Sequence, residues 1–268
     1  MNSRVIGVDL GVSAAKTVLL SHDKVERVNR VASHLFDESN LDELIPHNPE
    51  AIAVTGMGAQ RFGEAYRGIP VCHVDEFSAI AAGALHLTGL ARAVVASMGT
   101  GTAFVSASAG ANARHLGGSG VGGGTLLGLS QLLNGQADIP AAAAAAERGD
   151  LRKIDLCIGD VTDQDIPGLP AYTTVANFAR CSDQADSADC ARGLFNLVSQ
   201  TVGMLSVFAA RAEQVSDVIL VGTPAELPVV QELIHQVELL HPVHFHVPPF
   251  AAYATAIGAA ISLSTHTL

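Results

Sequence analysis

The 268 residues carry a formal net charge of −11; 49% of them are hydrophobic and only 15% are charged. This composition supplies a sizeable core, and the negative charge argues against a general nucleic-acid or acidic-membrane binder. The absence of tryptophan also leaves few platforms on which bases could stack. Because the N-terminus shows no signal-peptide pattern and no apolar run reaches about 18 residues, we expect a cytoplasmic protein without a membrane span.

The first 31 residues predict a β-meander. Arg4–Asp9, Lys16–Leu20 and Val25–Val31 are expected to be strands because Val, Ile and Leu dominate them or alternate with polar residues. The first turn, DLGVSAAK from Asp9 to Lys16, combines an acid, a glycine and a hydroxyl. Such a turn can hold Mg²⁺ through water and touch phosphate oxygens. An ordinary hairpin turn has the same residue types, so the residues alone leave both interpretations open.

The next segment places two acids at the start of a helix. A helix over Asp37–Ile45 and strands over Ala51–Thr55 and Ile69–Val74 are expected before it. Asp75 then precedes an apolar helical pattern over Ala79–Leu90 and is suited to cap it, with Glu76 in the first turn. By position alone both acids complement the helix dipole. A general base at a strand-to-helix junction is the functional alternative, because such junctions line clefts in α/β proteins.

A second unit repeats the organisation of the first. Ala93–Met98 and Ala103–Ser106 are expected strands, and the turn between them, Gly99–Thr102, again combines glycine with hydroxyls. This repetition suggests a duplicated architecture. Two such turns facing one another would form a phosphate clamp.

A glycine run follows the second unit. Gly117–Gly128 reads GGSGVGGGTLLG, with seven glycines in twelve residues, and an apolar helical pattern follows at once. Glycine is costly to order in a regular helix or strand, so we expect a loop here. A loop that opens a helix directs N–H groups and the positive end of the helix dipole at one point, which suits a phosphate. A flexible linker is the alternative.

The remaining chain alternates helices and strands. Expected helices cover Ala137–Asp150, Ala188–Arg211, Glu226–Leu240 and Ala251–Leu263, and expected strands cover Asp217–Val221 and Val243–Val247. The longest helix carries an apolar stripe suited to a core or a subunit interface. Gly222 and Thr223 follow a strand and offer a floor for an adenine ring. His244 and His246 lack a third ligand at suitable spacing, so no zinc site is expected.

Several motifs in order resemble one family. VDEFS, SMGTGTAF, HLGGSGVGGGTLLGL, IPGLP, TVANF and AIGAA together resemble the type II pantothenate kinases of the acetate and sugar kinase, heat-shock chaperone and actin superfamily. The resemblance implies an α/β, two-lobed actin-like ATPase (ribonuclease H-like) fold with the nucleotide in the inter-lobe cleft. The expected lobes are residues 1–92 and 93–268, the second of which contains a dimerisation helix.

The resemblance also implies roles for individual residues. The reaction would be ATP-dependent phosphorylation of pantothenate, with Glu76 as the general base and Asp9 as the Mg²⁺ ligand. The nucleotide would contact Asp9, Leu10, Gly11, Val12, Ser13, Ala14, Ala15, Lys16, Thr100, Gly101, Gly123, Gly124, Thr125, Leu126, Leu127 and Thr223. Pantothenate would contact Arg114, His115, Thr174 and Ala176, the last two within a segment, Thr174–Phe178, that helps close the partner's site in a homodimer. Coenzyme A or an acyl-CoA would be a product-site ligand.

Three residues depart from the family pattern. Val12 replaces the second glycine of the first turn, His115 replaces an arginine that contacts pantothenate, with Arg114 one place earlier, and Ser78 replaces an aspartate. Two alternatives therefore stay open: a related kinase that acts on a sugar or another hydroxyl substrate, and a nucleotide-binding paralogue without catalysis.

Overall fold

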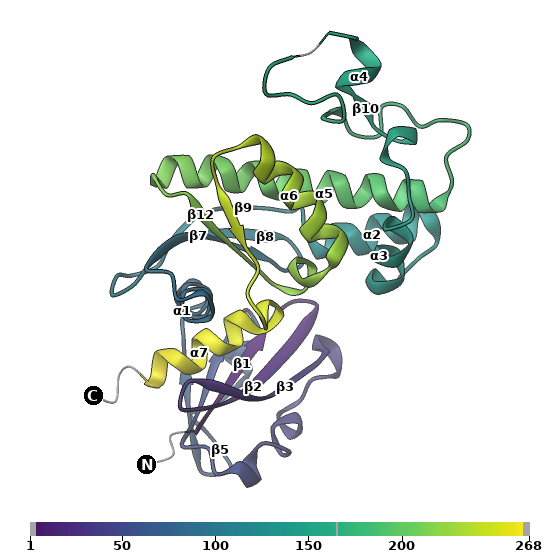
Figure 1. The fold of residues 1–268 in the computed structure, drawn as a ribbon. Coiled ribbons are helices and arrows are strands. Elements are labelled where there is room, and N and C mark those ends of the chain that lie inside the picture. Colours follow the sequence, from purple (N-terminus) through teal and green to yellow (C-terminus); the bar gives the residue numbers. More distant parts are fainter. Residues whose placement is uncertain (1–3, 165, 265–268) are drawn as a thin grey trace.

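The computed structural model describes residues 4–164 and 166–264, which form two α/β lobes, one above the other in Figure 1. The first lobe contains β1 (Arg4–Leu10), β2 (Ala14–Ser21), β3 (Lys24–Ala32), β4 (Ala51–Thr55), β5 (Ala65–Tyr66) and β6 (Ile69–His73) in the order β3-β2-β1-β4-β6-β5. The second contains β7 (Arg92–Met98), β8 (Thr102–Ser108), β9 (Arg114–Ser119), β12 (Asp217–Val221) and β13 (His244–His246) in the order β13-β12-β7-β8-β9.

The two sheets share one topology, apart from β5, which extends only the first sheet. In each, three consecutive strands form an antiparallel meander, β3-β2-β1 and β9-β8-β7, and the first strand pairs in parallel with a later one, β4 or β12. A further parallel strand, β6 or β13, extends each sheet. This repetition confirms the duplicated architecture expected from the sequence.

Two helices between the sheets are exchanged between the lobes (Figure 1). α1 (Glu76–Thr88) follows the first sheet but packs on the second, where Ile80 and Ala84 meet β7, β8 and β12. α7 (Ala254–Ser264) follows the second sheet but packs on the first, through Ala256 and Ile257. The two helices cross so closely that a Cβ on Gly83 would lie 1.9 Å from the Ala254 carbonyl oxygen. The predicted boundary between residues 92 and 93 falls just after α1.

The outer face of the second sheet carries the largest core. α2 (Gly123–Asn134), α3 (Ile139–Ala146), α5 (Ser187–Glu213) and α6 (Pro228–Leu240) pack there. α5 is long and apolar enough to cross a membrane, contrary to the expectation from apolar runs. However, 61% of its most apolar 18-residue window is buried inside the molecule. Such burial is typical of a core helix.

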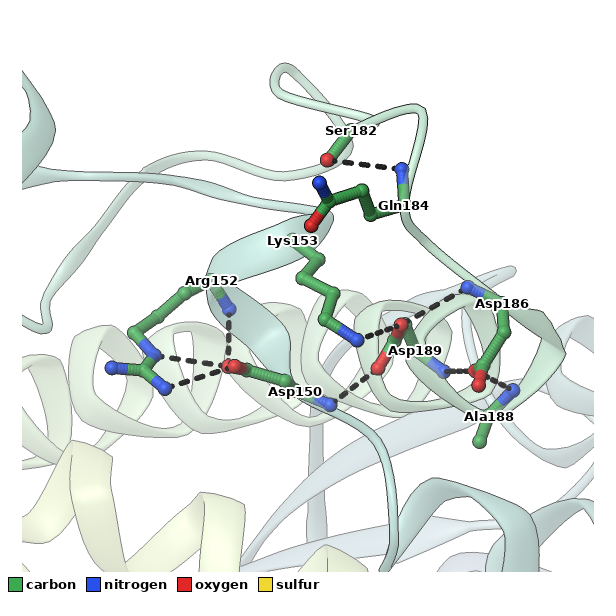
Figure 2. Close-up of polar contacts among 8 residues, drawn as sticks. All are labelled: Asp150, Arg152, Lys153, Ser182, Gln184, Asp186, Ala188 and Asp189. Atoms are coloured by element: carbon green, nitrogen blue, oxygen red, sulfur yellow. Dashed lines mark hydrogen bonds and ion pairs between the residues drawn. The ribbon is translucent and has the colours of Figure 1, made fainter.

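An arm, residues 150–186, projects beside the N-terminal end of α5 (Figure 1). It contains β10 (Leu156–Cys157), α4 (Ile158–Val161) and β11 (Thr174–Ala176). Asp189, in the first turn of α5, closes its base, as Figure 2 shows: the carboxylate accepts hydrogen bonds from the backbone N–H groups of Asp150 and Asp186 at 2.7 and 3.0 Å and from Lys153 Nζ at 2.9 Å. The entry and the exit of the arm are therefore held at one carboxylate.

Two expectations about secondary structure were wrong. Asp37–Ile45 forms 3₁₀ turns, over Glu38–Leu41 and from Ile45, because Asp37 and Asn40 side chains bond the local backbone. Gly117–Gly128 is not one loop: its start belongs to β9, which pairs with β8, and its second half to α2. Short 3₁₀ turns also cover Ser33–Leu35, Ala59–Arg61, Leu151–Lys153, Thr223–Glu226 and Ala251–Tyr253.

Candidate active site

A cleft of about 700 Å³ lies between the lobes. The β1–β2 turn and the start of α1 line it from the first lobe, and the β7–β8 turn, the start of α2 and the segment after β12 line it from the second. Its lining includes Asp9, Gly11, Val12, Ser13, Ala14, Lys16, Arg30, Glu76, Ser97, Thr100, Gly101, Gly123, Gly124, Leu127, Asp138, Gly222, Thr223 and Thr255. Most of the residues expected to contact nucleotide therefore surround one space.

The two glycine turns face one another across this cleft. Ser13 Oγ and Thr100 Oγ1 lie 2.9 Å apart, within hydrogen-bond distance, although 87 residues separate them in the chain. Both side chains are exposed. The two hydroxyl-bearing turns therefore meet as expected, and their role as a phosphate clamp stays a prediction.

Asp9 and Lys16 form the charged floor of the cleft. They are directly opposite one another on β1 and β2, with Lys16 Nζ 4.0 Å from Asp9 Oδ2. Burial and, to a smaller extent, the charge of Glu76 raise the pKa of Asp9 to about 6, against the opposing effect of Lys16. Burial lowers the pKa of Lys16. The buried carboxylate is thus incompletely compensated by its one lysine.

Glu76 begins α1 at the edge of the cleft. Asp75 caps the helix by accepting a hydrogen bond from the Ser78 backbone N–H at 2.8 Å, as expected. Desolvation, and then the charge of Asp75, raise the pKa of Glu76 above its ordinary value. The two acids therefore differ in role: one holds the helix, and the other presents an exposed carboxylate to the cleft.

The start of α2 differs from the expectation that its N–H groups point at a phosphate. The Gly123 and Gly124 N–H groups donate to the carbonyl oxygens of Gly99 and Thr100, each at 2.8 Å. These two amides are occupied because the β7–β8 turn lies directly against the helix. The helix N-terminus therefore braces the second turn.

Several expected nucleotide-contacting residues have side chains turned away from the cleft. Leu10, Ala15 and Leu126 are at most 1% exposed and belong to the cores, so only their backbones are able to contact a ligand. The Thr125 hydroxyl donates to the Gly120 carbonyl oxygen at 3.0 Å and accepts from the Gly122 N–H.

Val12 is 63% exposed and lines the cleft. It is absent from the residues with positive φ among those described, so its backbone conformation does not require glycine. The side chain rather than the backbone is what distinguishes this turn from the family pattern.

Gly222 joins β12 to the segment that carries Thr223. Its φ is +98°, and a Cβ there would lie 2.1 Å from the Met98 carbonyl oxygen. Glycine is therefore required for this segment to lie beside the β7–β8 turn. Thr223 lines the cleft next to it.

Arg114 and His115 point to different partners. Arg114 Nη2 donates to both carboxylate oxygens of Glu213 at 2.7 Å, and hydrogen bonds from Ser106 and Arg114 lower the pKa of Glu213. The His115 ring instead stacks on Phe77, with centroids 4.4 Å apart, and Phe77 follows Glu76. Of the two, His115 contacts the residue that follows the expected base in the sequence. Neither is among the described residues that line the cleft.

Thr174 and Ala176 lie on β11 in the arm rather than in the cleft of their own chain. A buried carboxylate, Asp155, anchors this segment by accepting hydrogen bonds from the Phe178 N–H at 2.8 Å and from the Asn177 and Asn196 side-chain amides at 3.0 and 2.7 Å. Asn196 also donates to the Thr174 hydroxyl. Their expected contact with pantothenate in a partner's site stays a prediction.

Sequence reasoning missed some of the polar residues that line the cleft. Arg30, Ser97, Asp138 and Thr255 were not singled out. Arg30 lies directly opposite Lys16 in the β2–β3 pairing, so a register drawn from the predicted hairpin is the signal that would have found it.

Sequence comparisons match this chain to known proteins. The family model described as Fumble matches residues 92–226, half of the chain. A type II pantothenate kinase of Oceanobacillus iheyensis is 28% identical over 228 residues, which cover 81% of this chain and 83% of that protein. One from Bacillus cereus is 24% identical over 233 residues, covering 82% and 84%.

Solved structures show the same fold at low identity. Component A of the (R)-2-hydroxyglutaryl-CoA dehydratase of Acidaminococcus fermentans aligns with a TM-score of 0.70 and 19% identity over 97% of each chain. A ROK family glucokinase from Streptomyces griseus, in complex with glucose and AMPPNP, aligns with a TM-score of 0.61 and 14% identity over 97% of this chain and 99% of that one. The fold is the expected two-lobed actin-like ATPase fold, and the chain belongs to the Fumble family, that of the type II pantothenate kinases.

Proposed function

We propose that this protein phosphorylates pantothenate with ATP, giving 4′-phosphopantothenate, the first step of coenzyme A biosynthesis. The observation that carries the proposal is the convergence of Asp9, Glu76 and the two facing turns on one cleft in a chain of this family. Phosphoryl transfer asks a protein mainly for positioning and charge neutralisation, and this cleft offers both.

Glu76 is the proposed general base. Its carboxylate would accept the proton of the pantothenate hydroxyl as the oxygen attacks the terminal phosphorus of ATP. Because desolvation and the charge of Asp75 raise its pKa, Glu76 is a stronger base than an ordinary glutamate. The hydroxyls of Ser13 and Thr100 would donate to phosphate oxygens once a nucleotide separates the two turns.

Asp9 suits a Mg²⁺ ion that is shared with the nucleotide. Among the described residues no group of three His, Cys, Asp or Glu side chains is arranged to hold a metal by itself. Mg²⁺ in phosphoryl-transfer sites commonly takes one or two carboxylates, with waters and phosphates completing the shell. The raised pKa of Asp9 marks a buried carboxylate that a cation would stabilise. When bound, the ion would neutralise charge on the phosphates.

The dimer is proposed on two features. Hydrogen bonds to Asp155 and Asp189 anchor the arm. The arm exposes the large apolar side chains Val161, Leu169, Tyr172 and Val175. We propose that it closes the pantothenate site of a second copy through Thr174 and Ala176, in a cytoplasmic homodimer. Coenzyme A or an acyl-CoA is the proposed product-site ligand.

The test is ADP release by the purified protein with MgATP and pantothenate. We expect turnover that depends on pantothenate and that falls about 10²- to 10⁴-fold in Glu76→Gln, the range typical of a lost general base. The matched control is Glu43→Gln, at an exposed acid outside the cleft, which should keep full activity.

One alternative has an observation in its favour. Arg114 is held by Glu213, so the arginine expected for pantothenate is not supplied by its neighbour in the sequence. ATP turnover with a sugar or another alcohol, but none with pantothenate, would replace the proposal by a related kinase. Nucleotide binding without turnover on any hydroxyl substrate would favour a paralogue without catalysis.

A further inference from the structure

A row of four polar residues crosses the first sheet beside the cleft. Arg30 on β3 pairs with Lys16 on β2, Lys16 with Asp9 on β1, and Asp9 with Thr55 on β4. Residues directly opposite one another on neighbouring strands have their side chains on the same face. Arg30, Lys16 and Asp9 line the cleft, whereas Thr55 is buried, so the first three form part of the cleft wall.

The two cations of this row lack a matching set of acids. Lys16 lies 4.0 Å from Asp9, whereas Arg30 is exposed and forms no ion pair with a carboxylate in the part of the chain that the structure describes. Burial lowers the pKa of Lys16, and the nearby charge of Arg30 lowers it further. Like charges on opposed strand positions repel. An anion in the cleft would relieve this repulsion.

The order of the strands indicates which part of a bound substrate the two cations would face. Arg30 is on the edge strand β3, whereas Glu76 follows β6, and β1 with Asp9 lies between them in the order β3-β2-β1-β4-β6. A hydroxyl substrate must reach Glu76 and would therefore lie on the Glu76 side of Asp9. The cation pair lies on the other side of Asp9. Lys16 is also near enough to Glu226, in the segment after Gly222, for that charge to raise its pKa. This is the side that the Thr223 segment lines.

We propose that Arg30, together with Lys16, binds the terminal phosphate of a nucleoside triphosphate in the cleft. The inference rests on the proposed function only in requiring that the cleft accepts such a nucleotide. The guanidinium offers a planar fork of N–H donors that matches phosphate oxygens. Arg30 is therefore expected to distinguish a triphosphate from a diphosphate.

The experiment is calorimetric titration of the full chain with a non-hydrolysable ATP analogue and with ADP, each with Mg²⁺ and without acceptor. Arg30→Ala should raise the Kd of the triphosphate about 10- to 100-fold, the scale of a charge-assisted hydrogen bond, and that of ADP less than about threefold. Arg30→Lys should fall between, because it keeps the charge and loses the fork. Arg27→Ala, on the opposite face of β3, is the matched control and should bind both like wild type.

Two results would overturn the inference. Equal weakening of the triphosphate and ADP would place Arg30 away from the terminal phosphate. Unchanged nucleotide affinity, with a raised KM for the acceptor, would assign Arg30 to an acidic group of the acceptor. Failure of the wild type to phosphorylate pantothenate, with the difference between triphosphate and ADP intact, would reject the proposed substrate and leave this inference standing.

Discussion

The two glycine turns occupy equivalent places in the two lobes, yet they are built differently. Asp9-Leu10-Gly11-Val12-Ser13 corresponds along the strands to Ser97-Met98-Gly99-Thr100-Gly101. Leu10 and Met98 are both fully buried. Around them, the first lobe places Lys16 and Thr55 opposite Asp9, whereas the second places Ala103 and Val221 opposite Ser97.

The first turn supplies charge, and the second supplies a fixed backbone. The second turn is held by hydrogen bonds from Gly123 and Gly124, whereas Val12 in the first is largely exposed. We infer that loss of the Asp9 charge beside the first turn acts on catalysis, and that substitutions packed against the second turn act on its shape.

Asp9→Asn should have the largest effect, and in opposite directions on activity and stability. We expect kcat/KM for MgATP to fall by about 10³-fold, because the charge that the cation and phosphates require is lost. The free energy of unfolding at pH 8 should instead rise by about 1 kcal/mol, since a buried carboxylate with a raised pKa opposes folding when ionised. Urea unfolding of both proteins measures this. A marked loss of stability at pH 8 would contradict it.

Changing the pH tests the same carboxyl without mutation. Its pKa is raised from 3.8 to about 6, so its stabilising contribution is complete below pH 3.8 and is lost as the pH rises through about 6. The stability advantage of Asp9→Asn should therefore vanish at pH 4. Activity requires the ionised form, so wild-type kcat/KM should fall below about pH 6. A profile that stays flat to pH 5 would argue against Asp9 as the charged ligand.

Gly122→Ala should have the next largest effect, because the added methyl group would clash with the backbone of the second turn. Its Cβ would lie 2.7 Å from the backbone carbonyl of Gly101, whereas a Cβ on Gly11 would come no closer than 3.1 Å, to the Ala14 carbonyl oxygen. We expect Gly122→Ala to lower the free energy of unfolding by about 1–3 kcal/mol and kcat/KM by about 10²-fold. Gly11→Ala should lower stability by less than about 1 kcal/mol. Equal losses in the two variants would remove the contrast.

Val12→Gly should have the smallest effect. Because Val12 already has an ordinary backbone conformation and an exposed side chain, glycine should lower stability by about 0.5–1 kcal/mol through backbone entropy. Steady-state assays should show kcat/KM within about threefold of wild type. A gain of tenfold or more would mean that the valine side chain keeps a phosphate out, as expected of a degenerate paralogue.

Much of the fold follows from local patterns. The expected strands, from Arg4–Asp9 to Val243–Val247, agree with the structure to within two residues at each end, because runs of Val, Ile and Leu have few other stable arrangements. The start of α1 was predictable from Asp75, whose side chain caps it. The helix expected over Asp37–Ile45 failed where side-chain hydrogen bonds of Asp37 and Asn40 compete with the helix.

The missed features depend on pairing between distant segments. The glycine run starts inside β9. This segment is a strand because its backbone forms hydrogen bonds with β8, and no side-chain pattern predicts that pairing. The occupied amides of Gly123 and Gly124 follow from contact with a turn more than twenty residues earlier. Arg30 lies in the polar strand Lys24–Ala32, and its place in the cleft emerges only when three strands are aligned.

The exchanged helices make the two halves of the chain dependent on one another. A fragment ending after α1 would carry a helix without the sheet it covers, and its own sheet would lack α7. The remaining half would have the reverse deficit. Each fragment alone would expose apolar surface and aggregate, while the two co-expressed would restore both layers. The duplicated halves are thus expected to behave as complementing fragments. A gene split between them would give a folded protein only when the two fragments associate, and so would report on that association.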